Sequence, residues 1–335
     1  MKKTIFVVDD SISNLTLAAA TLDTHYAVMT IPSGLKAIEL LKKVKPDLIL
    51  LDIEMPELDG FQVLDHLKSN DAYKYIPVIF LTARTDYKTE ADALEKGVVD
   101  FIAKPFNPAI LLNRVRHHID ISNLVWERTA ELYNARRDII FVLADVVENR
   151  DEATGDHLGR TSRNVKILLE HMLEKKVYYE QIKSWNFDLM AECSLLHDVG
   201  KINTPDSILK KPGKLTQEEF EVMKGHTLSG KKIIEKIVAR SGENMFLHHS
   251  GIFAISHHEK WNGQGYPYGL SQEDIPLQGR VMAIVDVFDA LVSKRVYKEA
   301  FAYEDAIGII SKERGKHFDP KIVDVFLEIT DCLKK

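Results

Sequence analysis

DLILLD, residues 47–52, decides the fold of the first third of the chain, because a short apolar run that ends in a carboxylate is typical of a buried strand. Three further runs have the same character: TIFVVDD at 4–10, VIFLTA at 78–83 and DFIAKP at 100–105. Between them lie amphipathic stretches such as SGLKAIELLKKV at 33–44, whose apolar residues recur at helical spacing. This alternation predicts an α/β domain with a parallel sheet and helices on both faces.

Polar residues stand where these predicted strands end. They are Asp9, Asp10, Asp52, Thr82 and Lys104. Ligands of such sheets bind outside the carboxyl ends of the strands, so we expect these side chains to meet at one edge. Carboxylates gathered in one place repel each other unless a cation lies among them, and oxygen ligands of this kind suit Mg²⁺. Lys104 and Thr82 would then hold phosphoryl oxygens. A plain polar strand end explains any one of these residues, but not the whole set.

The motifs in this segment are VVDD, LLDIEMPELDG, LTA and AKPF. With them, residues 1–119 resemble a response-regulator receiver domain. The resemblance implies a flavodoxin-like, five-stranded parallel sheet, Mg²⁺ held by Asp9, Asp10 and Asp52, and phosphorylation of Asp52 by a sensor histidine kinase. It also implies a phosphorylation switch formed by Thr82, Lys104 and the aromatic Phe101.

The composition bounds the class of protein. The 335 residues allow two domains, and 45% hydrophobic with 28% charged residues is ordinary for a soluble globular chain. A net charge of −6 argues against extended nucleic-acid binding, so we expect no DNA partner. Cys193 and Cys332 form neither a disulfide framework nor metal-ligand spacing, which fits a cytoplasmic location. Asp9 and Asp10 interrupt the apolar start too early for a signal peptide, and no stretch approaches the roughly 20 apolar residues of a membrane helix.

Residues 120–150 contain no proline or glycine and predict one long helix, of which 120–148 would be the linker between the domains. Apolar residues recur along it every seven positions, at Val125, Leu132, Ile139 and Val146, with Ala135 and Val142 between them. This pattern favours a short coiled coil and a homodimer, although Arg128 interrupts the seam. An equally good interpretation is that the helix packs its apolar stripe on its own second domain.

From about residue 138 onward the patterns are helical, and histidines and aspartates stand inside apolar runs. His197 and Asp198 end LMAECSLLHDVGK at 189–201, with Gly200 as the predicted end of the helix. Asp286 lies within a run too apolar to accept an unpaired carboxylate, which indicates a ligand or an ion pair. His157, His226 and the pair His257–His258 complete the set. Single histidines are more often ordinary core or surface residues, but the set exceeds what one ion can use and suggests two transition-metal ions bridged by a carboxylate.

A second histidine pair, His248–His249, precedes His257–His258 by nine residues. At about 100° per residue, nine residues turn a helix by half a revolution, so the two pairs point to opposite sides. We therefore expect His248 and His249 to lie away from the metal site.

Several separated motifs follow one another in this half: HDVGK at 197–201, PDSILKKPGKLTQEEFEVMKGH at 205–226, HHEKWNGQGYP at 257–267, RVMAIVDVFDAL at 280–291 and SKRVYK at 293–298. Thr216 and Glu219 also predict a capping box at the start of a helix. With these motifs, residues 138–335 resemble the HD-GYP family of cyclic dinucleotide phosphodiesterases, an all-α HD-type helical domain.

The resemblance implies a role for each matching residue. The implied metal ligands are His157, His197, Asp198, His226, His257, His258 and Asp286, with Asp198 as the bridge. Lys201 would contact the scissile phosphate and act in catalysis with Asp198. Further substrate contacts would come from Arg295, Lys298, Gly265, Tyr266 and Pro267. Some family members bind a third ion through a glutamate where this chain has Ala153, so we expect two ions, and Val296 replaces a usual proline.

The expected function is a two-component response regulator in which phosphorylation of Asp52 controls hydrolysis of cyclic di-GMP to pGpG, with GMP as a candidate further product. Iron, manganese, nickel and cobalt are the candidate ions, and a diguanylate cyclase (GGDEF) domain is a candidate partner. Two alternatives stay open. One is a binding module that captures the dinucleotide with little turnover, and the other is a phosphohydrolase for another cyclic dinucleotide or a nucleotide.

Overall fold

The computed structural model describes residues 2–83, 91, 93–151, 157–293 and 300–333. The chain divides into two compact units, Met1–Leu132 and Tyr133–Lys335. The division falls inside one long helix, α5 (Pro108–Glu148), which contains the predicted linker 120–148. The linker is thus continuous with the helix that closes the first unit. No helix among the described residues combines the length and apolar character needed to cross a membrane.

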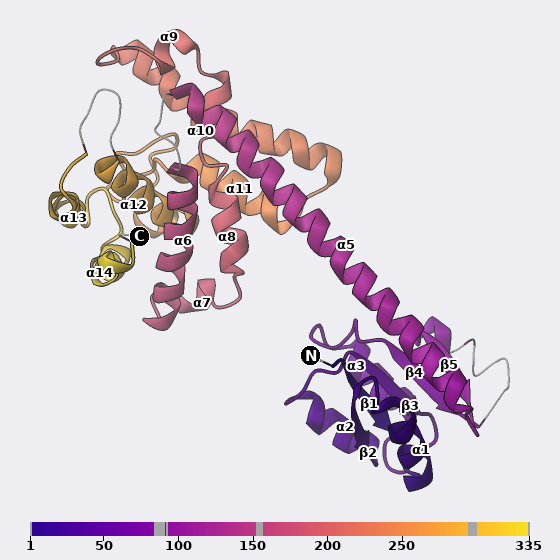
Figure 1. The fold of residues 1–335 in the computed structure, drawn as a ribbon. Coiled ribbons are helices and arrows are strands. Elements are labelled where there is room, and N and C mark those ends of the chain that lie inside the picture. The colour runs from indigo at the N-terminus through magenta and orange to yellow at the C-terminus, as the bar shows by residue number, and fades with distance from the viewer. Residues whose placement is uncertain (1, 84–90, 92, 152–156, 294–299, 334–335) are drawn as a thin grey trace. The chain divides into compact units, whose positions relative to one another are not determined.

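The first unit is an α/β domain built on five parallel strands in the order β2-β1-β3-β4-β5 (Figure 1). This is the flavodoxin-like order, as predicted. Its strands are β1 (Thr4–Val8), β2 (Ala27–Ile31), β3 (Leu48–Asp52), β4 (Val78–Thr82) and β5 (Asp100–Ala103). Its other helices are α1 (Ile12–Leu22), α2 (Gly34–Leu41) and α3 (Gly60–Lys68).

The two faces of this sheet are covered by different helices because successive strand residues point to opposite sides. Phe6 and Val8 pack with α2 and α3 on one face, whereas Ile5 and Val7 pack with α1 and the start of α5 on the other. Four strands lie where the apolar runs predict them. β2 is less evident in the sequence because it lacks a run of buried residues: only Ile31 is buried in it.

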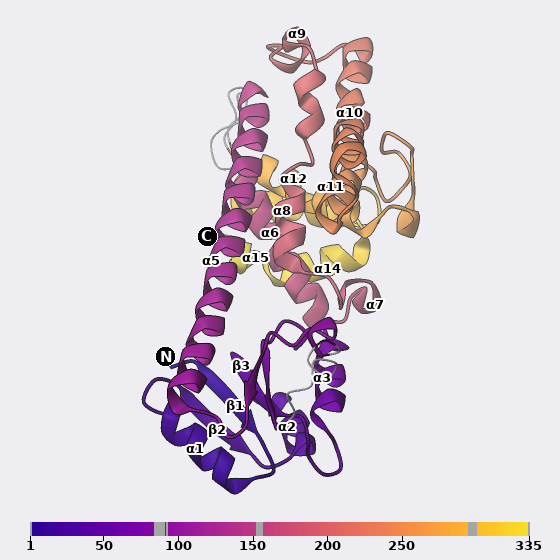
Figure 2. The same ribbon diagram turned by 90° about the vertical axis from the view of Figure 1, so that its right-hand side faces the viewer.

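The second unit is helical apart from isolated bridges, in agreement with the predicted all-α domain (Figure 2). After α5 its helices are η1 (Asn149–Asp151), α6 (His157–Glu174), α7 (Tyr179–Ile182), α8 (Phe187–Ser194), η2 (Val199–Asn203), α9 (Asp206–Leu209), α10 (Gln217–Ser241) and α11 (Met245–Ser256). They continue with η3 (Gln272–Asp274), α12 (Leu277–Val292), α13 (Tyr303–Lys312), α14 (Pro320–Glu328) and α15 (Thr330–Leu333).

One hydrophobic core joins α6, α8, α11, α12 and α14 in this unit. The α12 residues Val281 to Val285 are almost completely buried within it. The predicted capping box begins α10: the Glu219 amide donates to Thr216 Oγ1 at 3.2 Å, and the Thr216 amide donates to Glu219 Oε2 at 2.7 Å. These helices form the frame from which the site residues project.

Candidate functional site

A cluster of imidazoles surrounds the Asp198 carboxylate. His226 Nε2 and His257 Nε2 lie 3.2 and 3.4 Å from Asp198 Oδ1. His258 completes the group, in which every candidate ligand atom lies within 4.8 Å of the others. The residues come from the segment after α8, from α10 and from the end of α11. The fold therefore gathers side chains that are up to sixty residues apart in sequence.

A second cluster, formed by His157, His197 and Asp286, lies beside the first and meets the same 4.8 Å criterion. Asp286 Oδ1 is 3.6 Å from His157 Nε2 and 4.0 Å from His197 Nε2. Asp198 adjoins this cluster too, because its Oδ2 lies 3.5 Å from His197 Nε2. The two oxygens of Asp198 thus face different clusters, the arrangement expected of a bridging carboxylate.

Hydrogen bonds on the outer side of the rings orient four of the five clustered histidines. Nδ1 of His197, His226 and His257 lies 2.8, 2.7 and 3.0 Å from the carbonyl oxygens of Ser194, Met223 and Phe253. His157 Nδ1 lies 2.7 Å from Asp289 Oδ2. When Nδ1–H donates to such acceptors, the Nε2 lone pair points inward, which is how metal-ligating histidines are held.

The imidazole nitrogen and carboxylate oxygen atoms that face the inside of the clusters are suited to binding a cation. Among the described residues, His197 Nε2 and Asp198 Oδ1 are buried without a hydrogen bond of ordinary geometry. Buried polar atoms are costly without a partner, and nitrogen and carboxylate oxygen atoms are the donors that divalent transition metals prefer. The donor set therefore fits a divalent metal centre.

The pKa values of the clustered side chains are shifted by burial and by their charged neighbours. Burial lowers the pKa of His197 to about 4, and burial together with His257 and His226 holds that of His258 well below its usual value. Burial alone would raise the pKa of Asp198, but the neighbouring Lys201 and imidazoles hold it well below the ordinary range. In His226, burial is outweighed by the Asp198 carboxylate, which raises the pKa. His197 and His258 are thus held neutral, which leaves their lone pairs available to a cation, while Asp198 is held ionised.

The structure explains Gly200 differently from the sequence. We predicted a helix end there, but α8 ends at Ser194 and Gly200 lies within η2. A Cβ on Gly200 would stand 1.9 Å from the His226 carbonyl oxygen and 2.4 Å from the Gly230 amide nitrogen. Glycine is required because η2 presses directly on the backbone of α10, and this contact brings Asp198 to His226.

Tyr266 of the predicted substrate loop packs over the cluster of candidate ligands around Asp198. Its ring is 4.7 Å from that of His258, with the planes inclined by 32°. The buried Glu259 shapes this loop by accepting hydrogen bonds from the amides of Tyr268 at 2.8 Å and Leu270 at 2.9 Å. Gly265 allows a close turn, since a Cβ there would stand 2.3 Å from the Lys260 amide nitrogen. Pro267 follows Tyr266 in the same loop.

Three carboxylates close to the ligand clusters were not predicted from the sequence: Glu148, Glu259 and Asp289. Asp289 accepts hydrogen bonds from His157 and, at 2.6 Å, from Arg160 Nε. Burial opposes its ionisation, but these two partners lower the pKa of Asp289 to about 2. Its position three residues after Asp286 in the same apolar run was the available signal. Burial raises the pKa of Glu148 although Lys201 lies beside it.

The remaining predicted residues are placed as follows. Lys201 Nζ lies 2.7 Å from Asp198 Oδ2. His248 is exposed beside Glu243 and His249 contacts Gln278, so both lie apart from the described metal clusters, as predicted. Arg295 and Lys298, with Ala153 and Val296, lie outside the described residues.

The first unit brings its predicted phosphorylation residues together at one edge of the sheet. Candidate ligand atoms of Asp9, Asp10 and Asp52 lie within 4.8 Å of one another. Lys104 Nζ is 2.7 Å from both Asp9 Oδ2 and Asp52 Oδ2. Burial raises the pKa of Asp52 against the opposing effect of Lys104.

Thr82 and Phe101, the other predicted switch residues, belong to the neighbouring strands β4 and β5. Thr82 is buried at the carboxyl end of β4. The Phe101 ring packs against Phe80 at 6.2 Å between centroids and is only partly buried. This edge therefore combines a shielded carboxylate, a lysine and a hydroxyl, and the partly buried Phe101 ring lies farther back on β5.

Comparison with known proteins matches this division of the chain. The model of the response regulator receiver domain matches residues 5–116, and that of the HD domain matches residues 142–322. A Vibrio cholerae protein named "Probable cyclic di-GMP phosphodiesterase" is 40% identical over 339 residues, which cover 97% of this chain and 77% of that protein. "Cyclic di-GMP phosphodiesterase response regulator RpfG" of Xanthomonas campestris pv. campestris is 33% identical over 340 residues, covering 96% of this chain and 86% of that protein.

A further Vibrio cholerae relative, named "3'3'-cGAMP-specific phosphodiesterase 2", matches a shorter stretch of the chain. It is 36% identical over 201 residues, which cover 60% of this chain and 36% of that protein. The first two matches cover nearly the whole chain and so extend over both units of the structure. The chain therefore belongs to the response regulators in which a receiver domain is joined to an HD domain.

Proposed function

We propose that this protein is an HD-GYP phosphodiesterase that hydrolyses cyclic di-GMP to pGpG under control of phosphorylation at Asp52, with GMP as a candidate further product. The observation that carries the proposal is the pair of ligand clusters that share Asp198. The names of the relatives that match across both domains support the choice of substrate.

The proposed metal centre uses His226, His257 and His258 for one ion and His157, His197 and Asp286 for the other, with Asp198 between them. Iron, manganese, nickel or cobalt suits this mixture of imidazole and carboxylate. Two such ions, when bound, supply a hydroxide nucleophile at neutral pH and neutralise the oxygens of a phosphodiester undergoing in-line displacement.

The chain's own contribution begins with Lys201. Its ammonium is close to the shared carboxylate and only 12% exposed, so its charge acts in a poorly screened environment. A phosphate oxygen placed there gains a charge-assisted hydrogen bond that strengthens as negative charge accumulates in the transition state. The Tyr266 loop, held by Glu259, would bound the substrate beside the cluster and limit the access of water.

The proposed control begins at the receiver edge. Phosphorylation of Asp52 adds oxygens beside Lys104 and Thr82, with Mg²⁺ held by Asp9, Asp10 and Asp52. A sensor histidine kinase is the proposed phosphate source, and a diguanylate cyclase domain is a proposed partner because it would make the substrate. Phe101, partly exposed, is the proposed reporter of the switch.

The deciding experiment incubates protein purified without oxygen and loaded separately with iron, manganese, nickel or cobalt. We expect cyclic di-GMP to yield pGpG with at least one metal, and Asp198→Ala to abolish product formation. The panel includes 3'3'-cGAMP because one relative is named for that substrate. Faster turnover of 3'3'-cGAMP would identify that dinucleotide as the preferred substrate in place of cyclic di-GMP. Tight binding of cyclic di-GMP without product would show that the protein is a binding module.

A further inference from the structure

The last turn of α5 reaches the catalytic lysine. Glu148 is the final residue of this helix, and its carboxylate is 6% exposed. Lys201 Nζ donates to Glu148 Oε1 at 3.4 Å while it also contacts Asp198 at 2.7 Å. Among the described residues, the other oxygen of this carboxylate, Glu148 Oε2, is buried and has no hydrogen-bond partner. Burying such a group requires a compensating charge, and Lys201 provides it.

Arg150, two residues later, holds the backbone that carries Lys201. Its guanidinium donates to the carbonyl oxygens of Ile202 at 2.7 Å, Thr204 at 3.2 Å and Lys201 at 3.3 Å. Asp206 pairs with the same guanidinium at 2.6 Å. The end of α5 and the η1 turn that follows it therefore contact the Lys201 segment twice, through the side chain of the lysine and through main-chain carbonyl groups.

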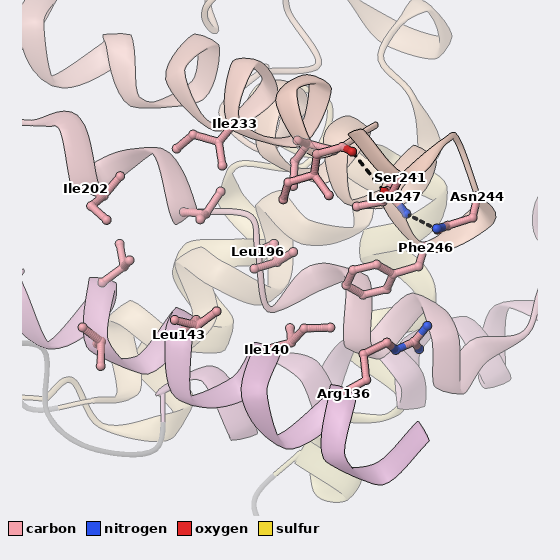
Figure 3. Close-up of a pocket in the computed structure, with 15 residues that line it drawn as sticks. Arg136, Ile140, Leu143, Leu196, Ile202, Ile233, Ser241, Asn244, Phe246 and Leu247 are labelled. Carbon is pink, nitrogen blue, oxygen red and sulfur yellow. Dashed lines mark hydrogen bonds between the residues drawn. The ribbon is translucent and has the colours of Figure 1, made fainter. Parts of the chain in front are cut away.

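Apolar packing between the same two segments leaves a gap. A cavity of about 450 Å³ is lined by Ile140 and Leu143 of α5 and by Leu196 and Ile202, which flank the catalytic sequence (Figure 3). Close-packed interfaces resist displacement, whereas a gap lets a helix shift at lower cost. The polar contacts at Glu148 and Arg150 thus join the end of α5 and η1 to the Lys201 segment beside a place where apolar packing is incomplete.

Lys201 is thus shared by two carboxylates of different kinds. Asp198 belongs to the proposed metal centre, and Glu148 belongs to the helix that begins in the receiver unit. Without Glu148, the ammonium would be drawn wholly toward Asp198 and away from the side on which Glu148 holds it. We propose that Glu148 is the positioning residue for Lys201, and that α5 acts on the catalytic site through this contact. The inference rests on the phosphate-binding role proposed for Lys201.

A double-mutant cycle tests the positioning role. We expect Glu148→Ala to lower kcat/KM about 10- to 100-fold, the usual effect of removing an orienting partner in such sites. In a Lys201→Met background the same substitution should change kcat/KM less than about twofold, because residues that act through one another are not additive. Equal losses in both backgrounds, or no loss in the wild type, would overturn the proposal.

Controls separate positioning from folding. Glu148→Gln keeps the size of the side chain and serves if Glu148→Ala does not fold, and Asp138→Ala removes an exposed carboxylate from the same helix as a matched control. The cycle is read with cyclic di-GMP and with bis(p-nitrophenyl) phosphate, and also as the Kd of cyclic di-GMP for metal-depleted protein. If only bis(p-nitrophenyl) phosphate is hydrolysed, the proposed substrate fails while the cycle still decides the role of Glu148. If neither ester is hydrolysed, the binding cycle decides it.

The route through α5 has a separate test. Beryllofluoride, a phosphoryl mimic, is expected to change the turnover of the wild type and to leave that of Glu148→Gln unchanged within about twofold. The same fold-change in both proteins would show that control bypasses Glu148. An unresponsive wild type would remove phosphorylation control and this route together, and the cycle would still stand as the test of positioning.

Discussion

At the scale of single residues, the candidate metal site of the second unit is built around buried carboxylates. Asp198 and Asp289 are each less than 10% exposed. An isolated buried carboxylate costs several kcal/mol, so each one indicates a fixed cationic partner. For Asp198 the neighbours are imidazoles and Lys201, and for Asp289 they are His157 and Arg160. Burial alone does not distinguish a metal ligand from the residue that orients one.

Asp289→Asn tests that distinction. The amide keeps the size of the side chain but loses the charge that fixes His157 and Arg160. We expect the affinity for the ion at His157, His197 and Asp286 to fall about 10- to 100-fold, as measured by metal content after dialysis against graded chelator. Asp324→Asn is the matched control, because its exposed pair with Arg314 should contribute at most about 1 kcal/mol. Unchanged metal affinity in Asp289→Asn would mean that His157 is oriented without this bond.

At the scale of elements, the site depends on η2 lying directly against α10. Gly200 makes this contact possible, and Gly230 lies on the facing side of α10. Because the atoms that a Cβ on Gly200 would meet are backbone atoms, no side-chain rotation relieves the clash. The position of Asp198 relative to His226 is therefore set by two helices that approach more closely than side chains would allow.

Gly200→Ala should separate these elements. We expect a loss of about 1–3 kcal/mol in stability, a lower Tm for the second unit and impaired metal binding. Gly308→Ala in α13 is the matched control, since a Cβ there meets nothing within 4 Å. That substitution should stabilise the protein by about 0.4–1 kcal/mol by restricting the unfolded chain. Scanning calorimetry with metal analysis measures both effects, and normal metal binding in Gly200→Ala would contradict this role of the contact.

At the scale of the whole molecule, the sequence predicted most of the architecture because the relevant signals are local. Apolar runs identified four strands, and the exposed edge strand β2 lacked such a run. Buried polar residues identified the set of candidate ligands, but their division into two clusters depends on how helices pack. Glu148 gave no signal at all, since a glutamate near the end of a polar helix looks like any exposed residue until its burial against Lys201 is known.

The seam of α5 also concerns the whole molecule. Val125, Leu132, Ile139 and Val146 are each at least 58% exposed within their own units. Ala144, Val147 and Glu148, which lie off the stripe, are buried near its end. An unpaired stripe of this kind favours a parallel coiled coil with a second copy of the chain.

Substitution of Leu132 and Ile139 together by lysine should abolish this association, because charged residues at seam positions oppose each other across a dimer. By sedimentation at micromolar concentration we expect the wild type to have twice the chain mass of 38.1 kDa and the double variant to be monomeric. Trp126→Lys is the matched control, since Trp126 is 74% exposed but lies off the heptad, and it should remain dimeric. A monomeric wild type would exclude the seam as an interface. Dissociation caused equally by Trp126→Lys would show that general apolar exposure, and not the heptad register, holds the two copies together.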